Sequence, residues 1–205
     1  MLLTSRQTQK IESCIAEVEK KTSGEIVVCA VKRSGAYAWT YWTWSAIGLL
    51  GGSAAAFFWE WNLELVRFVE YQLFGVAAGL LVSLLPVARR VLVSPRKRAF
   101  KVDRAAQATF LASGMAETQD RTGILIYVSE FEHRVEILAD RGIHTRVESD
   151  YWERQVRRIV EGIRARKTAE ALEAVIREVG GRLAELFPAR DQKDELPNTV
   201  LRDPN

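Results

Sequence analysis

Apolar and polar residues follow three different rhythms along this chain, and each rhythm predicts a different kind of element. Near the start, apolar residues recur at every third or fourth position, which predicts an amphipathic helix over Ser5–Lys20. The run Glu25–Val31 is short, apolar and β-branched, which is typical of a buried strand. From about Tyr37 to Ala88 the chain is mostly apolar and fits neither rhythm.

The polar remainder of the chain predicts further helices and strands. We expect a helix over Arg98–Gln119, then strands over Gly123–Val128 and Arg134–Ala139 joined by a short link. Two more helices follow, and the second ends at Pro188. In the helix that follows the apolar stretch, the expected core contacts are Phe100, Ala108, Leu111 and Met115.

The order of these elements predicts an α/β fold with a small mixed sheet. The strands at Glu25–Val31 and Gly123–Val128 are each reached through a helix, which favours a parallel pair. The strand at Arg134–Ala139 follows a short link and would add an antiparallel neighbour.

The apolar stretch predicts a hairpin of two transmembrane helices. Tyr37–Trp59 carries no charge and is long enough to span a bilayer, and a second span runs to about Ala88 with Arg67 and Glu70 at the interface. Aromatic rings prefer the headgroup level, so clusters at both ends of the first span predict membrane anchors. The tryptophans expected to serve as anchors are Trp39, Trp42, Trp44, Trp59 and Trp61. A buried helical hairpin inside a soluble protein is the alternative.

Charge predicts how this hairpin is oriented. Lys32 and Arg33 precede the first span, while the turn between the spans is net acidic. The second span is followed by a basic juxtamembrane cluster of Arg89, Arg90, Arg96, Lys97 and Arg98. Because positive flanks stay in the cytoplasm, we expect two spans in the inner membrane with both chain termini cytoplasmic. The cluster also suggests recognition of anionic lipids.

These boundaries divide the chain into four parts. Residues 1–36 hold the first helix and strand, 37–88 the hairpin, 89–188 the rest of the α/β domain, and 189–205 a polar tail expected to be disordered. The hairpin would therefore lie within the crossover between two strands of one sheet, which requires an even number of spans.

Small residues recur along both predicted spans at intervals that allow close approach of helices. Gly48, Gly52 and Ala56 form one such series. Gly75, Gly79 and Ser83 form the other. They would pack the two spans against each other or, alternatively, support a homodimer.

Composition narrows the function classes. The net charge of +3 and the lack of a recognition motif argue against nucleic-acid binding. Cys14 and Cys29 match no zinc or redox spacing and are interpreted as small buried apolar residues. The chain also shows no P-loop, nucleophile elbow or HExxH motif.

Several short motifs resemble the TPM domain family. The first is Thr22-Ser23-Gly24-Glu25-Ile26-Val27-Val28, which is similar to that family's opening strand. Further similarity lies in Gly123–Val128, Arg134–Ile137, Ala139–His144 and Asp194–Pro197. The closest resemblance is to bacterial membrane-bound members with an inserted hairpin. It implies a TPM-like α/β/α sandwich, with a sheet covered by helices on both faces, and a LemA-type membrane protein as a partner.

The chain departs from the family pattern at one informative place. Better-known members carry Asp-Asn-Gly before the second strand, where acidic residues are linked with metal binding. Here the aligned residues are Arg121, Thr122 and Gly123, and Asp120 is offset by one position. No cofactor is therefore expected, with calcium or magnesium as the alternative.

The turn after the third strand holds the candidate ligand-binding residues. These are Asp140, Arg141, Gly142 and His144. Gly142 would allow a turn with positive φ, Asp140 could orient His144, and Arg141 could hold an anion. A metal site would combine Asp140, His144, Glu148 and Asp150. The alternative is a polar turn with an internal salt bridge.

Together these features predict a membrane-anchored interaction or assembly module of the bacterial cell envelope rather than an enzyme. Its partners would be the lipid bilayer and a LemA-type protein or a second copy of the chain. The alternative is a weak metal-dependent phosphatase-like hydrolase.

Overall fold

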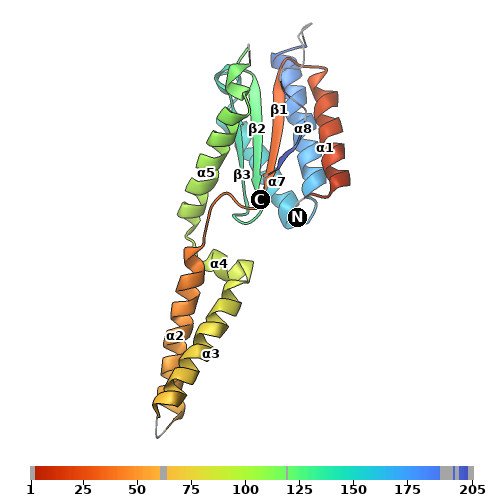
Figure 1. The fold of residues 1–205 in the computed structure, drawn as a ribbon. Coiled ribbons are helices and arrows are strands. Elements are labelled where there is room, and N and C mark those ends of the chain that lie inside the picture. Colours follow the sequence, from red (N-terminus) through yellow and green to blue (C-terminus); the bar gives the residue numbers. More distant parts are fainter. Residues whose placement is uncertain (1–2, 61–63, 119, 190–195, 197–198, 203–205) are drawn as a thin grey trace. The chain divides into compact units, whose positions relative to one another are not determined.

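A computed structural model describes residues 3–60, 64–118, 120–189, 196 and 199–202 (Figure 1). The chain divides into two compact units. One consists of Met1–Ser34 together with Ala99–Asn205, and the other is Gly35–Arg98. The predicted apolar insert at 37–88 lies inside the second unit, so the first unit is assembled from segments on both sides of it.

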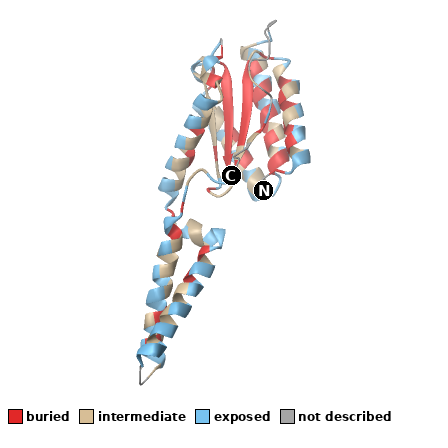
Figure 2. Ribbon diagram, viewed as in Figure 1, coloured by how far each residue is buried: buried red, intermediate tan, exposed pale blue. Residues whose placement is uncertain are grey.

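The first unit is built on a sheet of order β3-β2-β1-β4. β1 (Glu25–Val31) pairs parallel with β2 (Gly123–Ser129), from Glu25 opposite Gly123 to Val31 opposite Ser129. β3 (Arg134–Ala139) pairs antiparallel with β2. The predicted parallel pair and its antiparallel neighbour are therefore confirmed. Figure 2 shows β1 and β2 buried, as their continuous apolar runs predict.

One face of this sheet is covered by three helices. They are α1 (Ser5–Glu19), α7 (Ser149–Arg164) and α8 (Thr168–Leu186). α1 begins with a capping box, in which Thr4 and Gln7 bond to each other's backbone. Ile26, Ile124 and Ile126 point into this layer and are at most 1% exposed. The main hydrophobic core therefore lies between these helices and the sheet.

The opposite face is covered by α5 (Pro95–Ala112) and the short 3-10 helix η1 (Met115–Glu117). Val102, Ala106 and Met115 pack there against alternate residues of β1 and β2. The helices predicted on both faces are therefore observed. Of the predicted core contacts, Met115 is buried but lies in η1, and those on α5 are wrong, because Phe100 and Leu111 are 61% and 67% exposed. Ala108 is exposed as well.

The chain's last described segment corrects the prediction of a disordered tail. Leu201–Arg202 form β4, which pairs parallel with β1 at Cys29 and Ala30. Val200 is buried, and its amide donates to Glu12 Oε1 at 3.1 Å. A free edge of β1 offers unpaired backbone groups, and this short strand satisfies some of them. The rest of the predicted tail between 190 and 198, apart from Leu196, lies outside the described residues, as does 203–205.

The second unit is a helical hairpin with a short third helix. α2 (Trp39–Trp59) packs against α3 (Leu65–Ser83), and α4 (Pro86–Leu92) follows at their open end (Figure 1). The predicted second span to Ala88 is too long. Pro86 has no amide hydrogen to continue α3 and instead starts α4 in its first turn.

Candidate functional site

The interior of the α2–α3 hairpin is made of backbone contacts at glycine. A Cβ atom on Gly48 would overlap the Gly75 carbonyl oxygen, and one on Gly52 would overlap that of Tyr71. Gly79 lies equally close to the Trp44 carbonyl oxygen. The predicted packing of the two helices through their small residues is confirmed, because these glycines are used inside the hairpin.

The exterior of the same hairpin is apolar. Bulky side chains point outward over both helices, and the outer faces are exposed in Figure 2. The most exposed are Trp42 78%, Leu50 70%, Phe57 76%, Phe58 81%, Trp59 79%, Leu65 77% and Phe74 75%. A soluble protein rarely exposes contiguous apolar patches of this kind, so this surface marks an interaction with lipid or protein.

By length and composition, one helix among the described residues could cross a membrane. It is α3, Leu65–Ser83. α2 carries no charge and is 21 residues long, but its many Trp, Tyr, Gly and Ser residues lower its mean hydropathy. Of the two predicted spans, α3 is therefore the one that meets this criterion among the described helices, and a second transmembrane helix stays a prediction.

The tryptophans predicted as anchors lie at both ends of α2. Trp39 and Trp42 are 44% and 78% exposed near its start, and Trp59 is 79% exposed at its end. Trp44 is half-buried, and its indole Nε1 donates to the Ala88 carbonyl oxygen of α4 at 3.2 Å. Trp61 lies outside the described residues.

Arg89, one residue of the basic cluster, links α4 to α2 at the end of the hairpin. Arg89 donates to the Tyr41 hydroxyl at 3.0 Å, and its guanidinium lies 5.3 Å from the centre of that ring. It also donates to the Leu84 carbonyl oxygen at 3.2 Å. The side chain expected to face lipid headgroups is thus used to fix α4 against α2. Arg96 and Lys97 are exposed at the start of α5.

The predicted ligand-binding turn forms a short helix, α6 (Arg141–His144). Asp140 caps this helix by accepting from the Arg141 amide at 2.7 Å, and it pairs with Arg121 at 3.6 Å. His144 meets Asp140 only through its backbone amide, and its side chain is exposed. These contacts are those of a polar turn with an ion pair, and ligand binding at this turn stays a prediction.

The prediction that Gly142 allows a turn with positive φ is wrong. Its φ is not positive; the positive φ of 54° belongs to Arg121. A Cβ atom on Gly142 would lie 2.6 Å from the Asp120 carbonyl oxygen and 2.7 Å from that of Arg121. Glycine is therefore needed because two backbone segments touch there, with the Gly142 amide donating to the Arg121 carbonyl at 3.1 Å.

The acidic residues near this turn do not converge. Within the described part of the chain, no group of three or more His, Cys, Asp or Glu side chains could hold a metal ion. Glu148 is the N-cap residue of α7 and Asp150 lies in its first turn, and both are exposed. The predicted set with Asp140 and His144 is therefore not brought together.

A buried polar network that the sequence did not reveal lies where β1 and β2 end. Ser34 Oγ bonds to Ser129 Oγ at 2.9 Å and to the Tyr127 hydroxyl at 3.1 Å. Glu132, 2% exposed, accepts from the Ser34 amide at 3.1 Å and from Ser129 Oγ. The carboxyl ends of parallel strands often form ligand sites, but here each of these groups bonds to another. The network therefore fixes the chain as it leaves β1.

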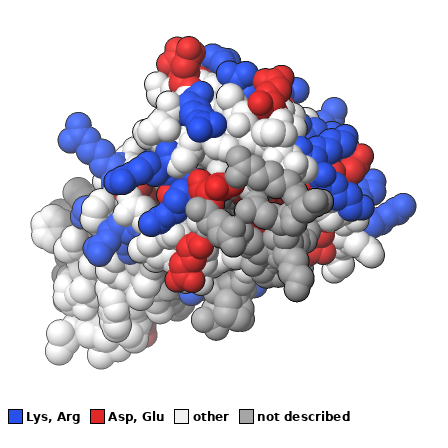
Figure 3. Space-filling model, turned by 90° about the horizontal axis from the view of Figure 1, so that it is seen from above, with Lys and Arg blue, Asp and Glu red and all other residues white. Residues whose placement is uncertain are grey.

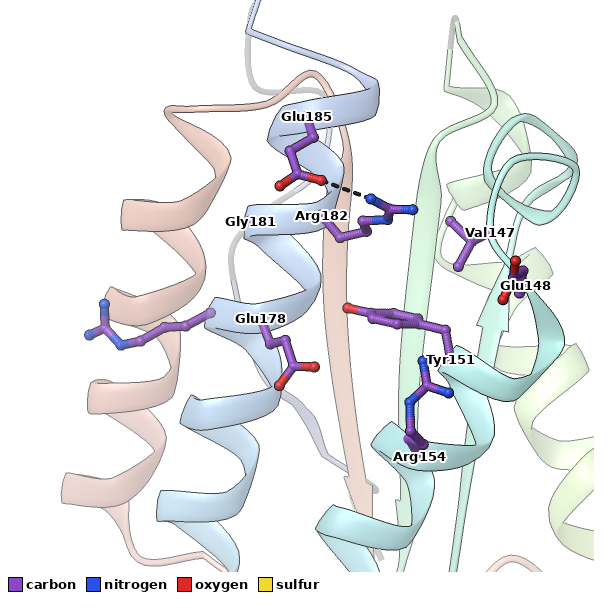
Figure 4. Close-up of a pocket in the computed structure, with 9 residues that line it drawn as sticks. Val147, Glu148, Tyr151, Arg154, Glu178, Gly181, Arg182 and Glu185 are labelled. Atoms are coloured by element: carbon purple, nitrogen blue, oxygen red, sulfur yellow. Dashed lines mark hydrogen bonds and ion pairs between the residues drawn. The ribbon is translucent and has the colours of Figure 1, made fainter.

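A groove between α7 and α8 brings several charged side chains together. Its volume is about 480 Å³, and Tyr151 extends from α7 with its hydroxyl towards α8 (Figure 4). Burial, and secondarily Glu178, raises the pKa of Tyr151 to about 12. Glu178 accepts from Gln155 at 2.6 Å and pairs with Arg158, while Arg182 pairs with Glu185 at 2.8 Å. The charges in this groove are thus largely neutralised by their neighbours.

The charged surface of the first unit mixes both signs. Figure 3 shows Lys and Arg side chains interspersed with Asp and Glu on the face seen from above. Ion pairs such as Arg177 with Glu17 at 3.0 Å join neighbouring helices on this unit. A nucleic-acid interface needs clustered basic residues, and the expectation that the chain does not bind nucleic acid stays a prediction.

Comparison with known proteins finds similarity to a known domain family over part of the chain. Residues 89–182 match the sequence model of the TPM domain. This match covers β2, β3 and the helices from the second half of α4 to most of α8, so the predicted resemblance is confirmed there. The curated proteins contain no match.

The structure is also similar to a solved one, the NMR structure of BA42 protein from the psychrophilic bacterium Bizionia argentinensis. The TM-score is 0.62 with 22% sequence identity, over 99% of this chain and 97% of that chain. At this identity the similarity shows a shared α/β fold. Neither comparison addresses the membrane-bound branch suggested by the sequence.

Proposed function

We propose that this chain is a membrane-anchored module that presents a TPM-like domain at the cytoplasmic face of the bacterial inner membrane. The observation that carries the proposal is the inverted packing of the α2–α3 hairpin. Its glycines meet inside, while side chains such as Phe58 and Phe74 are 81% and 75% exposed. Lipid is the solvent in which such a surface is stable.

Two spans are supported by the sheet as well as by the hairpin. β1 and β2 are adjacent strands of one sheet, and the whole insert Gly35–Arg98 lies between them in sequence. If α3 crossed the bilayer without α2, these two strands would lie on opposite sides of the membrane. The 21 residues of α2 extend about 31 Å at 1.5 Å per residue, which matches the hydrocarbon thickness of about 30 Å.

The charges at the ends of the spans support cytoplasmic termini. Lys32 and Arg33 precede α2, and Arg96 and Lys97 follow α4. Glu60 and Glu64 flank the turn between the spans. Basic flanks remain on the cytoplasmic side, so the turn would face the opposite side.

The domain is proposed to work by binding a partner rather than by catalysis. A LemA-type membrane protein is the first candidate, and a second copy of the chain is the other. The buried polar groups at the ends of β1 and β2 bond to one another, and the charges in the groove between α7 and α8 are largely paired. A weak metal-dependent phosphatase would need convergent ligands, of which the described residues hold no group of three.

Accessibility of single cysteines to a membrane-impermeant maleimide on spheroplasts tests the anchor. The variants are Lys32→Cys, Glu64→Cys and Arg96→Cys. We expect Glu64→Cys to react on intact spheroplasts, and the other two to react only after lysis. Opposite behaviour of Lys32→Cys and Arg96→Cys would show a single span, and the same behaviour of all three variants, whether all reactive or all protected until lysis, would contradict the anchor.

Co-purification tests the proposed partner. The chain would be co-expressed with a LemA-type protein and solubilised in mild detergent. Recovery of both in a defined ratio supports the interaction, and its absence at matched expression argues against that partner.

A further inference from the structure

We propose that α4 is an interfacial helix that lies in the headgroup layer and binds anionic lipid together with the start of α5. This inference rests on the proposed membrane anchor and adds a specific lipid-binding surface to it. The predicted second span would have placed the start of α4 inside a transmembrane helix that ends near Ala88. The structure instead ends α3 at Ser83 and starts α4 at Pro86.

The depth of α4 is fixed by the aromatic end of α2. Tyr41 accepts from Arg89 at 3.0 Å, and Trp44 donates to the Ala88 carbonyl at 3.2 Å. Tyr and Trp rings concentrate at the boundary between headgroups and acyl chains. Because α4 is bonded to two such rings, it lies at the same level as they do.

The outer side of α4 is apolar. Val87 and Val91, one helical turn apart, are 68% and 75% exposed. Leu84 and Leu85, just before the helix, are 60% and 58% exposed. These side chains continue the exposed apolar surface of α3, so the same lipid phase would cover both. A helix lying in the interface buries such a face at the headgroup and acyl boundary.

Positive charge follows α4 closely in the sequence. α5 begins at Pro95, with the Lys97 amide donating to Ser94 Oγ at 3.3 Å. Arg96 and Lys97 are exposed in its first turn. An anionic phospholipid is complementary to this pair of features. Its acyl chains would contact the apolar side chains, and its phosphate would contact the cations.

Spin-label depth measurements on the full chain in phosphatidylcholine–phosphatidylglycerol vesicles test the position of α4. Labels at Val87→Cys and Val91→Cys are compared with Arg96→Cys and Leu80→Cys, in a background with Cys14→Ala and Cys29→Ala. We expect the ratio of oxygen to nickel-chelate collisions at positions 87 and 91 to be several-fold higher than at position 96, and lower than at position 80.

The outcomes separate this inference from the proposed function. Water-level ratios at positions 87 and 91 with a deep label at position 80 overturn the interfacial helix and leave the anchor intact. A water-level ratio at position 80 contradicts the anchor itself. The two labels on α4 provide independent measurements if one variant does not fold.

Selectivity for spin-labelled phosphatidylglycerol over phosphatidylcholine tests the charged half of the surface. The Arg96→Gln/Lys97→Gln variant should lose selectivity by up to about fivefold per cation, which corresponds to ~1 kcal/mol each. Arg157→Gln/Arg164→Gln on α7 is the matched control with the same charge change and should retain it. Unchanged selectivity in the first variant overturns anionic-lipid binding by this surface.

Discussion

Gly48 and Gly75 meet backbone to backbone across the α2–α3 hairpin, so closely that a Cβ atom on either would overlap the carbonyl oxygen of the other. A Cβ atom on the neighbouring Gly51 would have nothing within 4 Å, although Gly51 lies on the same helix as Gly48. Two glycines three residues apart thus have different roles. One sets the distance between the helices, and the other faces away from the contact.

Gly48→Ala is therefore expected to destabilise the hairpin, with Gly51→Ala as its control. Overpacking of a tight contact costs about 1–3 kcal/mol. Both substitutions gain the same intrinsic helix propensity of up to about 1 kcal/mol, so their difference isolates the packing. The free energy of unfolding in mixed micelles measures it. Equal stability of the two variants would contradict the close approach of α2 and α3.

A second pair of glycines tests the packing of the α/β domain. A Cβ atom on Gly180 would overlap Val18 of α1, while Gly181 has open space beside it. We expect Gly180→Ala to lower the free energy of unfolding by about 1–3 kcal/mol because α1 must shift. Gly181→Ala should be neutral or stabilising by up to about 1 kcal/mol. Thermal unfolding followed by circular dichroism distinguishes them, and a stabilising Gly180→Ala would refute the α1–α8 contact.

The sequence predicted the strands whose own residues form a clear apolar pattern. The apolar runs at Glu25–Val31 and Arg134–Ala139 became strands with the predicted bounds. Contacts between distant residues were not predictable in this way. Leu201 pairs with Cys29, and no rhythm in a polar tail indicates a two-residue strand.

The errors have similar causes. Phe100 and Leu111 fit a helical stripe, but α5 buries the side that carries Val102 and Ala106 instead. The break of the second span was visible in Pro86, whose missing amide hydrogen favours a helix start. The positive φ predicted for Gly142 was wrong, because the backbone contact that requires glycine there comes from Asp120 and Arg121 across the fold.

The buried network at the end of β1 gives a third prediction. Glu132→Ala leaves the Ser34 amide and Ser129 Oγ without the carboxylate that they donate to. An unsatisfied buried polar group costs about 1–3 kcal/mol. We therefore expect the free energy of unfolding of the domain to fall by about 2–4 kcal/mol. Hydrogen exchange at the Ser34 amide should accelerate at the same time. Glu153→Ala on the exposed side of α7 is the control, and unchanged exchange at Ser34 would exclude the proposed role of Glu132.

Tyr151 gives a prediction for alkaline pH. Burial raises the pKa of Tyr151 to about 12, compared with 10 for an unperturbed tyrosine. The folded state therefore keeps this proton at a pH where the unfolded state has lost it. The contribution of Tyr151 to the free energy of unfolding is fully present below pH 10 and falls as the pH rises towards 12. Tyr151→Phe should remove this part of the pH dependence and one late-titrating step in phenolate absorbance. Titration of the wild-type residue near pH 10 would contradict its burial between α7 and α8.

Asp140→Ala distinguishes a structural turn from a catalytic one. The Asp140 carboxylate caps α6 through the Arg141 amide at 2.7 Å and pairs with Arg121 at 3.6 Å. Loss of a helix cap costs about 1 kcal/mol, so we expect a decrease of that size in the free energy of unfolding. Asp150→Ala, at an exposed position in α7, should change stability less. Hydrolysis of a generic phosphate ester by the detergent-purified protein, with calcium or magnesium added, should stay at the level of a buffer blank for the wild type and both variants. Turnover by the wild type that disappears specifically in Asp140→Ala would establish the phosphatase alternative and assign the turn to its active site.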